Sequence, residues 1–273
     1  MLKDKLENVR KKSPLIHNIT NYVTVNDCAN ILLACGASPI MADDVREVEE
    51  ITSICGGLSI NIGTLNHNTI PAMFLAGEKA NELNHPVILD PVGAGASKLR
   101  TETACKLLDE IKFTVIRGNI SEIRTLANGT GSTKGVDADV ADFVTEENLD
   151  KTIEFAKEFA NRIDTIIAIT GAIDIVTDGT IAYVIRNGHA MMSKITGTGC
   201  MLTAMTAAYL AANIDNPLEG SVASLCAMGL SGERAFGRLM SSDGNATYRD
   251  YIIDEIYHLD GNTLENGANY EIR

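Results

Sequence analysis

Residues 86–119 read PVILDPVGAGASKLRTETACKLLDEIKFTVIRGN, and this stretch contains the pattern that decides the fold. Its first run, Pro86 to Asp90, is short and apolar, as buried strands are, and a glycine-rich turn follows it. Residues 98–111 then show helical periodicity, and the apolar run 113–116 predicts a second strand. A strand, a helix and another strand in this order predict a βαβ unit with parallel strands.

The same alternation extends toward the C-terminus. Residues 148–162 show helical periodicity and precede another apolar run, Thr165 to Thr170. Two further runs, Asp174 to Thr177 and Ile181 to Ile185, are separated by Asp178-Gly179-Thr180, which favours a tight hairpin turn. We therefore expect an α/β fold in which a central, mostly parallel sheet is flanked by helices and ends in an antiparallel edge.

The last third of the chain, from Met201 to about His258, is apolar and alanine-rich with helical periodicity. Three closing helices are expected there, with boundaries marked by Pro217, Gly229 and Gly244.

Two segments show neither pattern and are predicted to be loosely ordered, residues 128–142 and residues 260–273. The first contains GTGSTKG (129–135), which superficially resembles a phosphate-binding P-loop but lacks its spacing and its Gly-Lys-Ser/Thr ending. Neither segment has the character of a linker between domains. The whole chain, residues 1–273, is therefore expected to form a single domain.

The chain has 273 residues, 45% of them hydrophobic, which is sufficient for one large α/β domain. Asp and Glu total 36 against 23 Lys and Arg, and the formal net charge of -13 argues against binding to nucleic acid, because that affinity depends on neutralising phosphates. An acidic protein that binds an anion must hold it with local groups, such as helix N-termini, backbone N–H groups, a metal ion or single Arg residues.

The opening sequence MLKDKLENVRKKSPL has no apolar core of signal-peptide length, and no segment reaches the roughly 18 to 20 apolar residues of a membrane-spanning helix. A cytoplasmic protein without membrane contact is therefore expected. The six cysteines lack C-x-x-C spacing, which disfavours disulfides and a structural zinc site, so most are expected to be buried small hydrophobic residues.

Polar or glycine-rich turns follow three predicted strands, at Pro91 to Gly95, Arg117 to Asn119 and Thr170 to Ala172. Ligands of parallel sheets bind beyond the carboxyl ends of the strands, so the three turns predict a phosphate-handling site. Arg117 could reach phosphate oxygens in a bidentate fork, or could be a solvated surface residue. Thr170 could bind phosphate, or could only end its strand.

The sharpest local signal is Thr196-Gly197-Thr198-Gly199-Cys200 at the start of a predicted helix. The glycines allow the backbone N–H groups of Gly197, Thr198 and Gly199 to converge at the positive end of the helix dipole, where they could hold a transferring phosphate. The alternative is an ordinary glycine turn with a threonine cap. The dipole could lower the pKa of Cys200 and let it accept a proton from an alcohol; the alternative for this side chain is simple packing.

Two carboxylates follow predicted strands. Asp90 ends the first apolar run, and Glu122 lies three residues after Asn119 on the same helix face. Both could serve Mg²⁺, which is bound by oxygen ligands. The alternatives are local, since Asp90 could cap the turn that follows it and Glu122 could complement the positive end of its helix.

Five motifs occur together and in the order typical of hydroxyethylthiazole kinases, which this chain resembles from about residue 13 to residue 240. They are HNITNYVTVNDCAN (17–30), SPIMADD (38–44), DPVGAGAS (90–97), RGNISEI (117–123) and ITGTGCMLTA (195–204). The resemblance implies a ribokinase-like three-layer fold, a homotrimer with active sites at the subunit boundaries, and salvage of the thiazole half of thiamine.

The resemblance also implies roles for individual residues. Arg117 and Thr170 would bind ATP, Met41 and Gly197 would line the thiazole site, and Asp90 and Glu122 would serve Mg²⁺. Ribokinase-like enzymes in general carry Asp where this chain has Cys200, whereas thiazole kinases carry Cys, which supports the narrower family.

The hypothesised reaction is in-line attack by the hydroxyethyl oxygen of 4-methyl-5-(2-hydroxyethyl)thiazole on the γ-phosphorus of Mg-ATP, with Cys200 as proton acceptor. A hydroxymethylpyrimidine or pyridoxal kinase, or a nucleotide-hydrate dehydratase, could share the phosphate turns. A cysteine acyltransferase would need a positioned histidine, which the sequence does not supply. A non-catalytic ATP-binding sensor is the remaining alternative.

Overall fold

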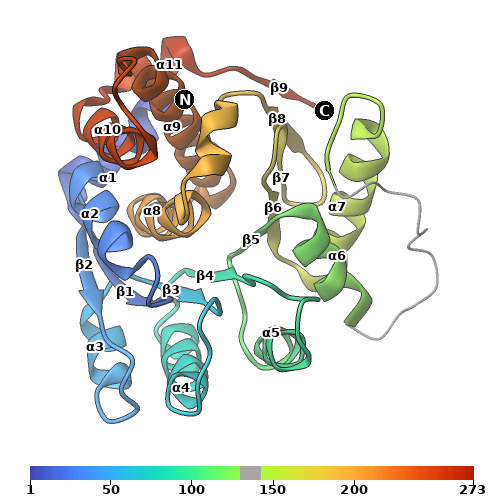
Figure 1. Ribbon diagram of the computed structural model, residues 1–273. Helices are drawn as coiled ribbons and strands as arrows, with labels where there is room; N and C mark the ends of the chain where they lie inside the picture. The colour runs from blue at the N-terminus through green and yellow to red at the C-terminus, as the bar shows by residue number, and fades with distance from the viewer. Residues whose placement is uncertain (130–142) are drawn as a thin grey trace.

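The computed structural model describes residues 1–129 and 143–273 (Figure 1). Most of the sequence GTGSTKG, residues 130–135, lies outside the described residues, as does most of the segment 128–142 that was expected to be loosely ordered.

A nine-stranded sheet runs through the described part of the chain in the order β2-β1-β3-β4-β5-β6-β7-β8-β9. Neighbouring strands are parallel from β2 to β6 and antiparallel from β6 to β9. The predicted mostly parallel sheet with an antiparallel edge is therefore confirmed. The strands are β1 (Leu15–Ile19), β2 (Ser38–Met41), β3 (Gly57–Asn61), β4 (Val87–Asp90), β5 (Val115–Gly118), β6 (Ile166–Ile169), β7 (Asp174–Thr177), β8 (Ala182–Ile185) and β9 (Tyr270–Ile272).

Helices cover both faces of this sheet, as Figure 1 shows. A 3-10 helix, η1 (Ala190–Lys194), precedes the long C-terminal helices. The α-helices are α1 (Leu2–Lys12), α2 (Val25–Cys35), α3 (Val48–Ile54), α4 (Thr69–Glu82), α5 (Lys98–Glu110), α6 (Ile120–Gly129), α7 (Leu149–Ile163), α8 (Thr198–Ala212), α9 (Pro217–Arg238), α10 (Asn245–His258) and α11 (Gly261–Gly267). No α-helix of residues 1–129 and 143–273 has the length and apolar character needed to cross a membrane.

Two hydrophobic cores lie on opposite faces of the sheet. Successive strand residues alternate between them: Ile88 belongs to the core beneath α1, α2, α8, α9 and α10, whereas Leu89 belongs to the core beneath α4, α5, α6 and α7. Val115 and Ile116 divide in the same way, because adjacent side chains of a strand point to opposite faces. The result is a three-layer sandwich, as expected.

Two local predictions were wrong. Gly229 does not mark a helix boundary but lies inside α9, where a Cβ atom would come within 2.6 Å of the backbone oxygen of Asn187. The glycine is thus explained by close packing rather than by a turn. The C-terminal residues are also ordered, since Asp260 caps α11 and β9 pairs with β8.

The predicted state of the cysteines is confirmed. All six are free, and four of them are buried, whereas Cys105 and Cys200 are partly exposed.

Candidate active site

The carboxyl ends of three neighbouring strands and the start of α8 meet at one edge of the sheet. Asp90 ends β4, Arg117 lies in β5 and Thr170 follows β6, and these three strands are adjacent. Helix α8 packs against β3 and β4 (Figure 1), and Gly199 in its first turn contacts the guanidinium of Arg117. The predicted phosphate residues are therefore brought together.

Asp90 is completely buried. Its Oδ2 atom accepts hydrogen bonds from Nδ2 of Asn61 and Oγ1 of Thr203, each at 2.9 Å, and lies 3.5 Å from Nη1 of Arg117. Its Oδ1 atom has no hydrogen-bond partner among the described residues. Burial raises the pKa of Asp90 to about 6, while the charge of Arg117 lowers it and the charge of Glu122 raises it. A carboxylate with an open oxygen and a raised pKa favours a nearby cation or a proton.

From its position in β5, Arg117 contacts the ends of β4 and β6 and the start of α8. Its Nη2 atom donates to Oγ1 of Thr170, and its Nη1 atom pairs with Asp90. A Cβ atom on Gly199 would lie 2.5 Å from Nη1, so a glycine is needed for the helix start to approach the guanidinium this closely. Two positive features, the guanidinium and the N-terminal end of a helix, thus face the same space and favour an anion.

Gly197 sets the direction in which α8 begins. Its φ of 92° is left-handed, and a Cβ atom there would lie 2.5 Å from Cγ2 of Thr24, so both backbone conformation and space require glycine. The first N–H groups of an α-helix have no partner within the helix, and here they belong to Thr198, Gly199 and Cys200. Two of them, the N–H groups of Thr198 and Gly199, belong to the set predicted to hold a phosphate, which also included the N–H of Gly197.

Cys200 lies in the same first turn, half-buried, and its Sγ atom accepts a hydrogen bond from Nδ2 of Asn21 at 3.2 Å. Burial raises the pKa of the Cys200 thiol, and the charge of Asp90 raises it further, whereas hydrogen bonds from Thr24, Asn61 and Asn21 lower it. The predicted lowering of this pKa is therefore wrong, because loss of solvent is the largest influence on the thiol and outweighs its hydrogen bonds.

Glu122 lies in the first turn of α6, where the alternative role left open by the sequence was to complement the positive end of the helix, and it forms reciprocal hydrogen bonds with Asn119. Its Oε2 atom accepts from the backbone N–H of Asn119, whose Oδ1 accepts from the N–H of Glu122, both at 2.9 Å. Its Oε1 atom accepts from the N–H of Gly93 at 2.8 Å. Each carboxylate oxygen retains acceptor capacity, since it has about two lone pairs.

The donor set fits Mg²⁺ better than a transition metal. The described residues contain no group of three or more His, Cys, Asp or Glu side chains arranged to hold a metal ion. Asp90 offers an unpartnered Oδ1, and its negative charge and that of Glu122 influence each other. Mg²⁺ is commonly held by one or two carboxylates together with waters and substrate phosphates, which matches this arrangement.

Met41 ends β2, the edge strand of the sheet, and its Cα is paired with that of Asn18 in β1. The side chain is partly buried and packs against the core beneath α8. Strands β1 and β3 lie between β2 and β4, which are therefore about 14 Å apart at ordinary strand spacing, and Met41 is level with Ile88, two residues before Asp90. Met41 thus lies at the same carboxyl edge, but not beside the phosphate residues.

Three residues at this edge were not assigned a role from sequence: Asn21, Asn61 and Thr203. Asn61 ends β3 as Asp90 ends β4, and their Cα atoms are register partners. Thr203 lies one turn beyond Gly199 in α8 and also donates to its backbone oxygen, at 3.1 Å. A polar residue at the end of each apolar run was the available signal for Asn61; nothing local distinguished Thr203.

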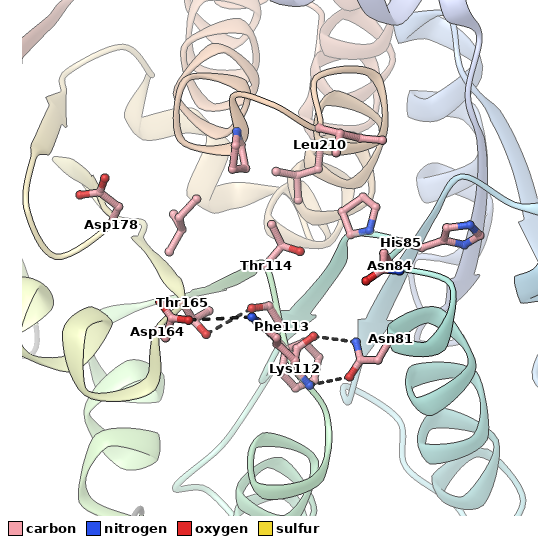
Figure 2. A pocket seen from close by; sticks show the side chains of 14 residues that line it. Asn81, Asn84, His85, Lys112, Phe113, Thr114, Asp164, Thr165, Asp178 and Leu210 are labelled. Carbon is pink, nitrogen blue, oxygen red and sulfur yellow. Dashed lines mark hydrogen bonds and ion pairs between the residues drawn. The ribbon is translucent and has the colours of Figure 1, made fainter.

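A cavity of about 390 Å³ lies at the amino ends of the parallel strands, opposite the candidate site. Figure 2 shows its lining residues, among them Phe113 and Thr165 at the amino ends of β5 and β6 and Leu210 near the end of α8. The side chain of Asn81 closes one wall, with hydrogen bonds of 2.9 and 2.7 Å to the backbone of Lys112. Because ligands of parallel sheets bind at the carboxyl ends, this cavity is separate from the candidate site.

A family model described as the Hydroxyethylthiazole kinase family matches residues 6–262. A Clostridium acetobutylicum protein named hydroxyethylthiazole kinase is 69% identical over 271 residues, which cover 99% of each chain. A protein of the same name from Clostridium tetani is 49% identical over 269 residues, covering 98% of this chain and 96% of the relative.

Two solved structures are similar in fold. That of the hydroxyethylthiazole kinase protein from Pyrococcus horikoshii has a TM-score of 0.88 and 34% identity and covers 100% of this chain and 98% of its own. The pyridoxal kinase from Staphylococcus aureus, solved in complex with AMP-PCP, has a TM-score of 0.59 and 18% identity, covering 95% and 97%. At that identity the second likeness shows a shared fold alone.

Proposed function

The chain belongs to the hydroxyethylthiazole kinase family, and from that premise we propose how its residues carry out the reaction. The function is transfer of a phosphoryl group from ATP to the hydroxyl of 4-methyl-5-(2-hydroxyethyl)thiazole, as thiamine salvage requires. The observation that carries the proposal is the contact between the glycine start of α8 and Arg117, which is itself bonded to Asp90 and Thr170. It supports a phosphate site at this edge of the sheet.

Arg117 and Thr170 are proposed to bind the phosphates of ATP. The backbone N–H groups of Gly197, Thr198 and Gly199 would stabilise the charge that develops on the transferred phosphoryl group. Fixed dipoles and a guanidinium are effective here because phosphoryl transfer depends mainly on positioning and charge stabilisation.

Cys200 is proposed to contact the attacking alcohol. The alcohol oxygen forms a bond to the γ-phosphorus, the bond from that phosphorus to the β,γ-bridging oxygen breaks, and the alcohol proton passes to the sulfur where that sulfur is a thiolate, which becomes a thiol. Since the pKa of Cys200 is raised, most of the thiol is protonated at neutral pH. Orientation of the alcohol is therefore expected to contribute more to the rate than proton abstraction.

Asp90 and Glu122 are proposed to hold Mg²⁺, because Oδ1 of Asp90 has no hydrogen-bond partner among the described residues and each oxygen of Glu122 retains acceptor capacity. The ion would neutralise charge on the phosphates of ATP. Asp90 also orients Arg117, so its carboxylate would serve both cations.

Met41 and Gly197 are proposed to line the thiazole site, and the whole chain is proposed to act as one domain within a homotrimer. The position of Met41 on an edge strand supports a site that a second subunit completes. Tyr22 and Val23, which precede Thr24 beside Gly197, are 60% and 64% exposed, as expected for a subunit contact. Six free cysteines suit a reducing compartment, so a cytoplasmic location is proposed.

The decisive experiment measures phosphate transfer from Mg-ATP to the thiazole alcohol, beside a hydroxymethylpyrimidine and pyridoxal at equal concentration. Preferential formation of the thiazole phosphate is expected. Phosphorylation of only a rival alcohol would retain the fold and reject the substrate, whereas ATP binding without any transfer would favour a sensor. Sedimentation at several protein concentrations tests the trimer, and an active monomer would contradict the shared site.

A further inference from the structure

Two buried asparagines connect the thiol of Cys200 to the carboxylate of Asp90. Nδ2 of Asn21 donates to Sγ of Cys200 at 3.2 Å and lies 3.1 Å from Oδ1 of Asn61, to which it also donates. Nδ2 of Asn61 in turn donates to Oδ2 of Asp90 at 2.9 Å. An unbroken series of side-chain hydrogen bonds therefore runs from the sulfur to the carboxylate.

Backbone donors fix the orientation of both amides. Oδ1 of Asn21 accepts from the N–H groups of Val23 and Thr24, each at 3.1 Å, so its Nδ2 must face the thiol. Oδ1 of Asn61 accepts from the N–H of Gly63 at 2.9 Å, so its Nδ2 must face the carboxylate. A backbone N–H is always a donor, so the oxygen of each amide must face it. The nitrogen of Asn21 must then donate to Cys200, and the nitrogen of Asn61 must donate to Asp90.

The two amides are placed where a misoriented side chain would be costly. Asn21 and Asn61 are 3% and 2% exposed, and a buried amide without hydrogen-bond partners destabilises the folded state. Three elements contribute: Asn61 ends β3, Asp90 ends β4, and Asn21 lies between β1 and α2. The relative position of Cys200 and Asp90 is thus fixed by the two asparagines as well as by the direct hydrogen bond from Thr203 of α8 to Asp90.

We propose that Asn21 and Asn61 are positioning residues of the kinase reaction, which hold the Cys200 thiol and the Asp90 carboxylate in fixed orientations toward the transferring phosphate. The proposal rests on the proposed roles of Cys200 and Asp90. Neither amide is required to touch ATP or the thiazole. Their loss is therefore expected to lower kcat while leaving the KM for ATP within about threefold.

The isosteric variants Asn21→Asp and Asn61→Asp test this. Each keeps the shape and the oxygen that accepts from the backbone, but replaces a donor with a negative oxygen. The expected result is a kcat at least about tenfold lower in both, since misplacing catalytic groups by small distances has effects of this size or larger. The neutral variants Asn21→Ala and Asn61→Ala provide the same test if a buried second carboxylate prevents folding.

A second readout separates positioning from mere structural support. Alkylation of Cys200 by iodoacetamide, followed across pH and located by mass spectrometry, reports the thiolate without ATP or thiazole. Asn21→Asp is expected to slow it about tenfold at a fixed pH below the thiol pKa, because a donor is lost and a negative charge is added. The charged and titratable groups near the sulfur, Asp90 and Cys28, are unchanged in this variant.

Asn213→Asp is the matched control. Asn213 is 5% exposed and hydrogen-bonded on both sides of its amide, but it lies at the far end of α8. It is expected to reproduce any loss of stability without changing kcat or the alkylation profile of Cys200.

The proposal is overturned if folded Asn21 and Asn61 variants keep wild-type kcat, or if Asn21→Asp leaves the alkylation profile unchanged. It is equally overturned if kcat falls as far in Asn213→Asp. The alkylation result does not depend on the substrate, so an error in the assigned alcohol would show itself separately, as absent thiazole phosphorylation by the wild-type protein.

Discussion

Replacing Asp90 with asparagine is expected to stabilise the protein near neutral pH and to abolish most of its turnover. Burial raises the pKa of this carboxyl from its ordinary value of 3.8 to about 6, against the opposing charge of Arg117. A carboxyl whose pKa is higher in the folded than in the unfolded chain binds its proton more tightly when folded. Its negative charge therefore destabilises the native state at neutral pH.

The size of this effect follows from the pKa difference. One pKa unit corresponds to about 1.4 kcal/mol, so the shift sets a ceiling of about 3 kcal/mol. Asparagine can still accept from Asn61 and Thr203 through one oxygen, and its nitrogen would replace an oxygen that has no partner. The lost attraction to Arg117 offsets part of the gain, so about 1 to 2 kcal/mol, or roughly 2 to 4 °C in Tm, is expected.

The pH dependence gives the sharper test. Between about pH 4 and 6 the folded wild type holds more protons on Asp90 than the unfolded chain, so this contribution to stability falls as pH rises through that window. The advantage of Asp90→Asn should be complete at pH 7 to 8 and nearly absent at pH 4. Urea unfolding at one protein concentration, without Mg²⁺ or ATP, measures it directly.

Two outcomes would refute this reasoning. A variant less stable than the wild type at pH 8 would mean that the pairing with Arg117 outweighs the burial of the charge. An advantage that does not change with pH would mean that it does not arise from ionisation of Asp90. Turnover, measured on the same preparations, should fall at least about 100-fold, because the variant loses the negative group proposed to orient Arg117 and hold Mg²⁺.

The remaining predictions concern the ATP side of the site and the thiol. Gly199→Ala is expected to raise the KM for ATP about tenfold with little change in stability, because the new Cβ displaces the guanidinium of Arg117. Gly237→Ala is the control, because a Cβ atom at Gly237 would have no neighbouring atom within 4 Å, and it should leave the kinetics unchanged. Thr170→Val is expected to raise the same KM roughly five- to tenfold through loss of one hydrogen bond, and an unchanged KM would contradict its assignment to ATP. Cys200→Ser should lower kcat about 100-fold, and wild-type turnover would exclude a proton-accepting role. Cys200→Asp should remain active or improve, so a folded but inactive protein would count against that role.

Three of the parallel strands, β4, β5 and β6, were predictable because their signal is local. Each of β4, β5 and β6 is a short apolar run with a polar turn after it, and the hairpin of β7 and β8 is marked by Asp178 and Gly179. Strand β9 has three residues and depends on pairing with β8, where the rings of Tyr183 and Tyr270 lie 5.7 Å apart. Such a strand is stabilised by a tertiary contact, so the sequence around it carries little sign of it.

Those residues of the candidate site that lie at the carboxyl ends of predicted strands could be identified from the sequence. Asp90, Arg117 and Thr170 come together because their strands are neighbours in the sheet and parallel. Asn61 meets Asp90 for the same reason, but its importance depends on knowing that β3 lies beside β4, and strand order is not a local property. Asparagine also occurs at many ordinary turns, so residue type alone could not identify it.

The pKa of Cys200 is raised rather than lowered, and the charge of Asp90 is predicted to destabilise the folded state, for the same physical reason. Where α8 packs on β3 and β4, solvent is removed from both groups, and burial is the largest influence on each pKa. A helix dipole can be inferred from sequence, but desolvation depends on what the fold places above the helix start. The same burial that destabilises the free carboxylate strengthens its attraction to a cation, because charges interact more strongly in a medium of low dielectric constant. Mg-ATP should consequently stabilise the wild type much more than Asp90→Asn. Equal stabilisation of the two proteins would contradict the proposal that Asp90 binds the cation.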